Sequence, residues 1–333
     1  MELYYGLSRT LYLITSFIDY FLVPRAWHRH RLKRLLRSLS PEERRQADER
    51  VAYYCKLSHS TPVPQTAPIQ GGVLGGIVRV GEYRFPFDKK RRFTYYFFDL
   101  YKVVRHFDPS FRMFYIHGDV NEIPAAPALV KSRPILPDNA NAVILKLNRH
   151  RHYAMMVKHD IPFAQKKDML VSRSTWANHS AQRRALCEKF WDHPLCDVGK
   201  TRFEPNEDLP QAVKPFLTVR EQLQYKFIAS VEGENMASNL KWVMSSNSVA
   251  VSPPLKFETW FMEGRLIGGY HYIEVKPDFS DLEEKLRYYM AHPEEAEAII
   301  AHAHEHVGQF GNRRLERVVG LSVADAYFKR TQE

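Results

Sequence analysis

Two carboxylates and a lysine follow an apolar run in the second half of the chain. The run Tyr225–Val231 is typical of a buried strand, and it leads into Glu232-Gly233-Glu234 and then to Lys241. Carboxylates, amides and an ammonium group placed directly after a strand can hold a polar or charged ligand. In parallel sheets, ligands bind in the crevice beyond the carboxyl ends of the strands. The segment 232–241 is therefore predicted to line a binding site.

Asp119 has a similar position earlier in the chain. It follows the apolar segment RMFYIH at 112–117, which predicts a buried strand, and it lies in the sequence Gly118-Asp119-Val120. A carboxylate on the loop after a strand is available for chemistry. The alternative is an ordinary turn, since aspartate is common in turns.

Basic residues cluster close to other predicted strands, three times along the chain. This pattern favours a positively charged cleft that would suit a polyphosphate or an anionic acceptor. The alternative is charge scattered over a solvated surface. The basic residues are Lys131 and Arg133, Arg149, and Lys166 and Lys167, with Arg173 after the strand 169–171.

The elements around the segment 225–241 follow a strand–helix–strand order. A helix is predicted at 236–244, a second strand at 248–251 and a third at 270–276. This βαβ order implies a parallel sheet, so the predicted fold class is α/β.

Length and composition leave several classes of protein open. The 333 residues suffice for two domains, and 44% hydrophobic residues allow a large core. The net charge of +10 favours nucleic acid, an anionic membrane or a phosphorylated substrate as partner. Three cysteines without framework spacing argue against a disulfide-rich secreted protein. Glycine-rich phosphate loops, the G-x-S-x-G elbow and the H-E-x-x-H zinc motif are missing from the sequence.

The first 37 residues combine an apolar helix with a basic run. Arg9 and Asp19 interrupt the apolar segment, so it is a poor membrane-spanning helix. A membrane-surface anchor and a core helix followed by a solvated basic helix both remain open. The apolar face would consist of Leu3, Leu7, Leu11, Ile14, Ile18 and Leu22.

Long contiguous motifs resemble glycosyltransferase family 90, which contains bacterial lipopolysaccharide core transferases and eukaryotic protein O-glucosyltransferases. The motifs are EGENMASNLKWVMSSNS, ETWFMEGRLIGGYHYIEVKPDFSDLEEKL, GDVNEIPAAPALVKSRPI and HPLCDVG, within residues 80–305. The resemblance implies a GT-B-like fold, with two Rossmann-like domains facing each other across a cleft. It also implies a UDP-sugar donor, inversion at the anomeric carbon and no metal or other cofactor.

The resemblance also assigns roles to residues. Asp119 matches the base that takes the proton of the acceptor hydroxyl. Arg173 matches an arginine that faces the diphosphate, although LVSRSTW lacks the family's preceding aromatic residue and following glycine. The remaining donor-binding residues implied are Glu232, Gly233, Ser238, Asn239, Lys241 and Glu258.

The predicted function is hexose transfer from a UDP-sugar to the lipopolysaccharide core. The acceptor would be a lipid-linked, phosphorylated oligosaccharide at the cytoplasmic face of the inner membrane, with no nucleic-acid partner. The alternatives are a capsule or protein acceptor, or a non-catalytic protein that binds nucleic acid or membrane. The predicted segments are an N-terminal helical segment 1–57, an acceptor domain 58–190, a donor domain 191–310 and a C-terminal helix 311–333.

Overall fold

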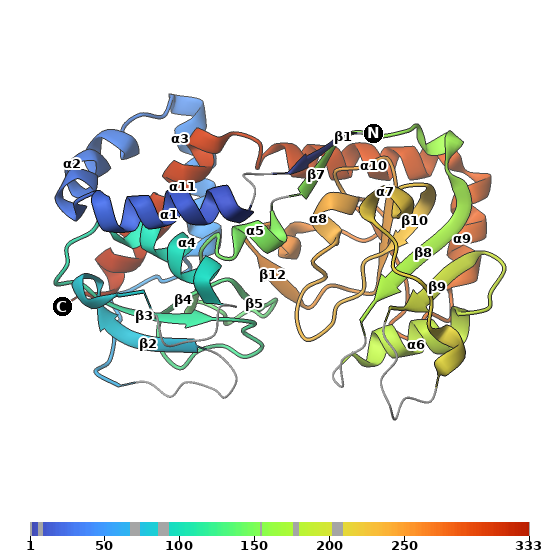
Figure 1. Cartoon of the computed structure of the whole chain (residues 1–333), viewed down its shortest axis with the longest axis horizontal. Helices are drawn as coiled ribbons and strands as arrows, with labels where there is room; N and C mark the ends of the chain where they lie inside the picture. Colours follow the sequence, from blue (N-terminus) through green and yellow to red (C-terminus); the bar gives the residue numbers. More distant parts are fainter. Residues whose placement is uncertain are drawn as a thin grey trace. The chain divides into compact units, whose positions relative to one another are not determined.

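The computed structural model describes residues 2–5, 9–66, 74–85, 93–153, 155–175, 180–201 and 209–332, without the side chains of residues 2–5 and 155. It divides into two compact units, which we name by their sheets (Figure 1). The parallel-sheet unit comprises Met1–Gly6, His152–Lys256 and Met262–Gln309. The mixed-sheet unit comprises Leu7–Arg151, Phe257–Phe261 and Phe310–Glu333.

The parallel-sheet unit is built on five parallel strands in the spatial order β13-β11-β10-β8-β9. Numbered along the chain, and read from the β9 edge, this is the doubly wound order 2-1-3-4-5. The strands are β8 (Lys167–Ser174), β9 (Cys196–Lys200), β10 (Tyr225–Ala229), β11 (Val249–Ser252) and β13 (Ile273–Glu274). A separate antiparallel pair joins β1 (Glu2–Tyr5) to β7 (Met155–His159).

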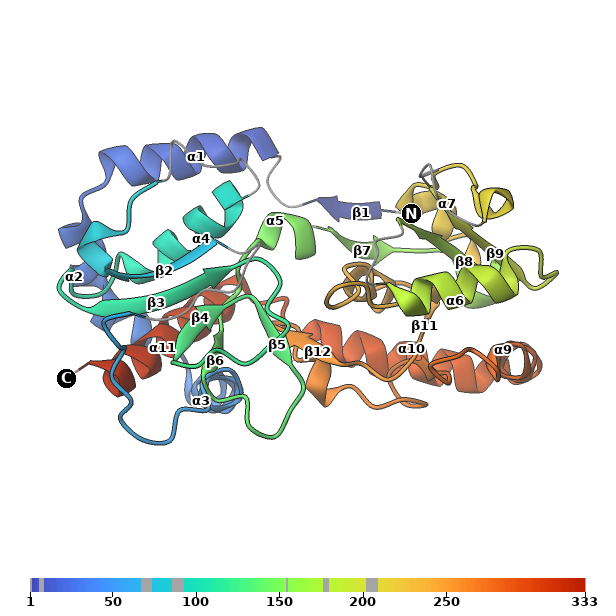
Figure 2. The same cartoon turned by 90° about the horizontal axis from the view of Figure 1, so that it is seen from below.

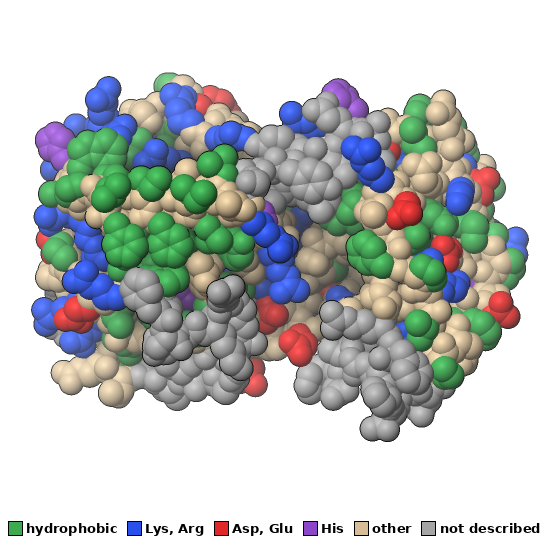
Figure 3. All heavy atoms as spheres, in the orientation of Figure 1, with side chains coloured by type: hydrophobic (Ala, Val, Ile, Leu, Met, Phe, Trp, Pro, Cys, Tyr) green, Lys and Arg blue, Asp and Glu red, His purple; other side chains and the backbone are tan. Residues whose placement is uncertain are grey.

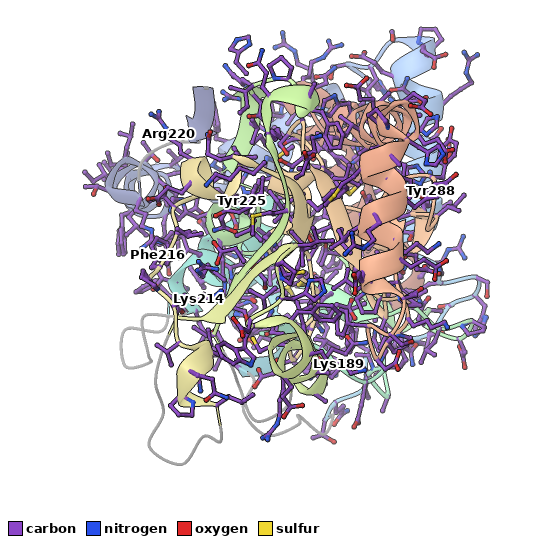
Figure 4. The ribbon with its side chains drawn as sticks, turned by 90° about the vertical axis from the view of Figure 1, so that its right-hand side faces the viewer. Lys189, Lys214, Phe216, Arg220, Tyr225 and Tyr288 are labelled. Atoms are coloured by element: carbon purple, nitrogen blue, oxygen red, sulfur yellow. The ribbon has the colours of Figure 1, made fainter. Side chains whose placement is uncertain are left out.

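One face of this sheet carries a hydrophobic core. Side chains two residues apart, such as Phe227, Ala229 and Val231, share that face and pack against three helices. These helices are α6 (Ala181–Phe190), α9 (Leu282–Ala291) and α10 (Pro293–Gly308). In Figure 4, α9 is the helix that carries the labelled Tyr288. Two short helices complete the unit, α7 (Val219–Gln222) and α8 (Leu240–Val243).

The mixed-sheet unit has a four-stranded sheet in the order β2-β3-β4-β6. β2 runs antiparallel to β3, and the other neighbours are parallel. The strands are β2 (Leu74–Arg79), β3 (Arg112–His117), β4 (Ala128–Val130) and β6 (Ala142–Ile144). A second, two-stranded ladder pairs β5 (Ser132–Pro134) with β12 (Phe257–Thr259).

Helices cover both faces of the mixed sheet (Figure 2). α4 lies on one face with α1 outside it, and α11 and α3 lie on the other. α3 begins after Ser40, because the Ser40 hydroxyl accepts from the Glu43 amide and Pro41 occupies the first turn. The helices are α1 (Arg9–Leu22), α2 (Arg25–Leu36), α3 (Pro41–Tyr54), α4 (Thr94–Val104) and α11 (Arg313–Thr331), with α5 (Arg149–His152) at the junction with the other unit.

The α/β fold class is confirmed, and several local expectations are corrected. Arg133, expected close to a predicted strand, lies within one, because residues 132–134 form β5. The predicted helix 236–244 shortens to α8, at Leu240–Val243. The predicted domain segments also differ from the units: β8 pairs with both β9 and β10, so residues 152–190 belong with the later strands.

Within the described ranges, no helix has both the length and the apolarity needed to cross a bilayer.

Candidate active site

The parallel-sheet unit has a topological switch point between β8 and β10. β8 is the first strand of this sheet along the chain and β10 the third, and they are neighbours. Connections leaving the carboxyl ends of such neighbours diverge and open a crevice where ligands bind. The segments that leave these ends begin at Thr175 and Ser230. The second is the segment that the sequence predicted to line a site.

Arg183 of α6 links the two segments. Its guanidinium donates to the carbonyl oxygens of Val231, at 3.2 Å, and of Thr175, at 3.3 Å. Gly233 permits this close approach, because a Cβ at residue 233 would lie 3.0 Å from the Arg183 Cζ. A guanidinium between the two strand ends brings positive charge to the switch point.

Two buried hydroxyl groups lie beside the same strand ends. Ser230 directly follows β10 and is fully buried, and Ser180 precedes α6 and is 4% exposed. Neither hydroxyl has a hydrogen-bond partner within the described part of the chain. A buried hydroxyl left unpaired costs about 1 to 3 kcal/mol, and a hydrogen bond to a bound ligand is one way to recover that cost. Both can donate to a polar ligand.

Three of the predicted donor residues shape or border the loop after β10. The buried Glu232 carboxylate accepts from the Lys256 amide at 3.2 Å. The Asn239 side-chain amide donates to the Ala229 carbonyl at 2.9 Å, which ties the loop back to the strand. Ser238 is exposed. These contacts hold the loop in place, while the diphosphate contacts predicted for Glu232, Ser238 and Asn239 stay a prediction.

Lys241 and Arg173 are engaged with the protein itself. Lys241 is 1% exposed, and its ammonium group pairs with Glu263 at 2.8 Å. Arg173 donates to the carbonyl oxygens of Ser172, Asp197 and Pro215, and to both carboxylate oxygens of Asp197 at 2.9 and 3.0 Å. These bonds use all five of its donors. Direct diphosphate binding by either residue would require an exchange of partners.

Asp197 is the centre of the network around Arg173. Tyr225 and Lys214, both labelled in Figure 4, also donate to its carboxylate, at 2.8 and 3.2 Å. Burial by itself would raise the pKa of Asp197, but the hydrogen bonds from Tyr225, Arg173 and Lys214 and the Arg173 charge lower it overall. The network joins the end of β8, through Arg173, to the starts of β9 and β10, where Asp197 and Tyr225 lie.

In the mixed-sheet unit, Asp119 is the second residue after β3. Gly118 has a φ of 113°, a conformation that favours glycine, and it turns the chain after the strand. The Asp119 side chain is 39% exposed and forms an ion pair with buried Lys131. Burial and then the charge of Asp119 raise the pKa of Tyr96. Asp119 is thus oriented by an ammonium group and still open to solvent, as a general base requires.

Glu258 and Arg133 form a buried ion pair in the mixed-sheet unit. They face each other across the β5–β12 ladder, with 2.7 Å between the Arg133 Nε and a Glu258 oxygen. Arg133 also donates to the Tyr53, Tyr54 and Ala142 carbonyls. Glu258 was predicted on the donor side of the molecule, but it lies in the unit that contains Asp119.

Four of the five predicted anion-binding cations are paired with carboxylates. Besides Lys131 and Arg133, Arg149 donates to Asp99 at 2.7 Å and Lys166 to Asp160 at 2.8 Å. Lys167 is exposed and lies 4.8 Å from the centre of the Tyr225 ring. The paired cations mainly hold the fold. Anion binding by them stays a prediction, and a bound anion would have to compete with the carboxylates that already pair with them.

The sequence did not single out Arg183, Ser180 or Ser230. All three lie near the carboxyl end of a strand, which is the one local signal that could have identified them. Serine and arginine are common in such positions, so that signal becomes selective only when β8 and β10 are known to be neighbours.

Comparison with known proteins identifies the class. The chain belongs to glycosyltransferase family 90. The sequence model of "Glycosyl transferase family 90" matches residues 157–315. The chain is also 41% identical over 294 residues to "O-glucosyltransferase LpsA" of Dichelobacter nodosus, covering 87% of this chain and 85% of that protein.

The family membership confirms the resemblance drawn from the sequence motifs and makes the chain a glycosyltransferase. A non-catalytic protein that only binds nucleic acid or membrane does not fit this result. The match at 157–315 falls mostly on the parallel-sheet unit.

Proposed function

We propose that the protein transfers a hexose, with glucose as the first candidate, from a UDP-sugar to a lipid-linked lipopolysaccharide core saccharide with inversion. The name of the Dichelobacter nodosus relative supports a glucosyl donor, and the "LpsA" in it supports the lipopolysaccharide acceptor. The observation that carries the proposal is the switch point between β8 and β10, with its arginine and two unpaired hydroxyls.

In this proposal the donor binds at the switch point. The diphosphate carries negative charge that increases as the sugar–phosphate bond breaks, so cations and N–H or O–H donors there stabilise the transition state. Ser180, Ser230 and Arg183 are the groups on the described part of the unit that fit this role. Gly233 leaves room for the Arg183 guanidinium beside the loop after β10.

We assign Asp119 as the general base of the chemical step. Its carboxylate takes the proton of the acceptor hydroxyl as that oxygen attacks the anomeric carbon. The bond from the anomeric carbon to the phosphate oxygen breaks on the opposite face, and UDP leaves with the electron pair. This single displacement inverts the configuration. Lys131 orients the carboxylate for the proton transfer.

Asp119→Asn is the direct test. Asparagine keeps the shape but cannot accept the proton, so kcat should fall by about 10²- to 10⁴-fold. The UDP dissociation constant should stay within about twofold, because the amide removes no donor contact. Turnover would be measured by UDP release from a panel of UDP-sugars, and UDP binding by calorimetry. The same assay with EDTA tests the expectation that no metal is required.

Asp108→Asn is a matched control. Asp108 is also an aspartate of the mixed-sheet unit, and it accepts from the Ser110 amide at 2.8 Å in a turn. This variant should keep wild-type turnover. Turnover near the wild-type level in Asp119→Asn would remove Asp119 from the role of base.

A further inference from the structure

α1 is attached to the mixed-sheet unit through one of its faces. The Tyr12 hydroxyl donates to Asp99 at 2.7 Å, and the Ser16 hydroxyl accepts from Lys102 at 2.7 Å. The Phe17 ring packs edge-on against Phe98, with 4.8 Å between centres. Asp19 pairs with Arg105, and Tyr20 stacks edge-on against Tyr101. The contacts on this face hold α1 against the core of the unit.

The opposite face of α1 is apolar and exposed. Its residues recur every three or four positions, which places them in one stripe along the helix. Figure 3 shows hydrophobic side chains gathered along α1 on the side that faces the viewer. We call these residues the apolar stripe: Leu11, Ile14, Ile18, Phe21 and Leu22, with exposed fractions of 45%, 50%, 50%, 59% and 73%. Contiguous apolar surface of this kind marks an interaction site.

α2 adds positive charge and an aromatic ring at the end of the stripe. Pro24 separates the two helices, and Trp27 in the first turn of α2 is 50% exposed. The segment 25–37 contains no acidic residue. Its exposed basic residues are Arg29, Lys33, Arg34 and Arg37. A tryptophan between an apolar stripe and a basic helix has the arrangement found at a membrane–water interface.

We propose that the apolar stripe and α2 form a docking surface for an anionic phospholipid bilayer. The stripe would enter the boundary between head groups and acyl chains, and the basic residues of α2 would contact the acidic head groups. Since α1 is already folded and held by its inner face, binding requires no ordering of the helix. This surface goes beyond the proposed function, because it stands on α1 and α2 alone.

A second copy of the chain is a less suitable occupant. A twofold interface brings the same patch of both subunits together, so each basic α2 would lie close to its equivalent. Like charges at short range oppose that arrangement, whereas acidic lipids complement it.

The test measures binding of the full chain to vesicles, without donor or acceptor. Wild-type protein should co-sediment with vesicles of phosphatidylglycerol and phosphatidylethanolamine, and only weakly with phosphatidylcholine. Ile14→Gln/Ile18→Gln should reduce binding about tenfold or more, since two half-exposed apolar side chains no longer enter the bilayer. Ile267→Gln is the matched control, because Ile267 is 61% exposed on the other unit. It should bind as wild type does.

Further readouts separate the possible failures. Salt at about 1 M, which shortens the Debye length to about 3 Å, should weaken binding to acidic vesicles. Circular dichroism and UDP release without vesicles should be unchanged in the double variant. The vesicle assay uses no donor or acceptor, so its outcome does not depend on whether the proposed transferase function is correct. Absence of vesicle binding in the wild type, equal binding by the double variant, or self-association through the stripe in its place would each overturn the proposal.

Discussion

Several buried lysines of the parallel-sheet unit are paired with carboxylates. Lys241 lies against Glu263 and Lys166 against Asp160, and both pairs are almost entirely enclosed. Removing one partner of such a pair leaves an isolated charge in a medium of low polarity, which is strongly destabilising. These lysines therefore hold loops in position. Within the described segments at the switch point, the groups that we assign to a ligand are the Ser180 and Ser230 hydroxyls and the Arg183 guanidinium.

Ser230→Ala distinguishes a ligand contact from a structural hydroxyl. If the hydroxyl donates to bound UDP-sugar, the dissociation constant for UDP should rise about three- to tenfold, as for the loss of one hydrogen bond. The melting temperature without ligand should stay equal or rise, because an unpaired buried hydroxyl is removed. Calorimetry and thermal unfolding measure the two effects.

Ser252→Ala is the control for that variant. Ser252 ends β11, is 1% exposed, and its hydroxyl donates to the Pro253 carbonyl at 2.9 Å. Its removal should cost about 1 kcal/mol of stability and leave UDP binding unchanged. If Ser230→Ala behaves in the same way, its hydroxyl is structural.

At the scale of elements, β12 ties a distant part of the chain into the mixed-sheet unit. Beyond the Glu258–Arg133 pair, the Trp260 ring stacks on Tyr54 with 4.1 Å between centres. The Trp260 indole donates to Glu316 at 2.8 Å. Arg50 and Lys146 also pair with Glu316, at 2.6 and 2.5 Å. A five-residue segment, Phe257–Phe261, thus connects β5, α3 and α11.

Glu258→Ala should destabilise the protein by about 3 to 5 kcal/mol, because Arg133 would remain buried without its partner. The double variant Arg133→Met/Glu258→Leu should recover much of this loss, since no isolated charge remains. Urea unfolding measures both free energies. If Glu258 instead serves the donor, the single variant should weaken UDP binding under conditions in which it stays folded.

Glu283→Ala is the control for an exposed pair. Glu283 pairs with Arg287 one turn further along α9, and both are half exposed. Its loss should cost at most about 1 kcal/mol. A similar small cost for Glu258→Ala would contradict the structural role of β12.

At the scale of the whole molecule, three buried imidazoles make stability depend on pH. Burial lowers the pKa of His28 to about 4 and those of His106 and His117 to about 3, and for His28 and His106 the Arg105 charge lowers it further. In the unfolded chain an imidazole has a pKa of about 6.5. The stabilisation is therefore complete above about pH 6.5 and is lost as the pH falls toward the folded values.

At about pH 5, each of these imidazoles should reduce the free energy of unfolding by about 2 kcal/mol relative to neutral pH. In wild type, the free energy of unfolding should be lower at about pH 5 than at pH 7.5. His106→Leu should make this difference smaller by about 2 kcal/mol, whatever the effect of the substitution at neutral pH. Urea unfolding at the two pH values measures the difference. His59→Leu, at an exposed position, should keep the wild-type difference. An unchanged difference in His106→Leu would contradict the prediction.

Local signals predicted the elements well. β3 spans the predicted residues 112–117, and α11 occupies the predicted C-terminal helix. Apolar periodicity and capping act within a few residues, so they can be recognised in one segment at a time. The prediction was wrong where a segment depends on a distant partner: residues 132–134 form a strand because β12 lies beside them.

The sequence by itself determined the α/β class, the family motifs and the positions of Asp119 and of the loop after β10. Only the tertiary structure decided that β8 and β10 are neighbours, and hence that Arg183, Ser180 and Ser230 belong to one candidate site. It also decided that Lys241, Arg133 and Glu258 have internal partners. Strand order and ion pairing join residues that lie far apart in sequence, and no local pattern encodes which of several acids a given cation will contact.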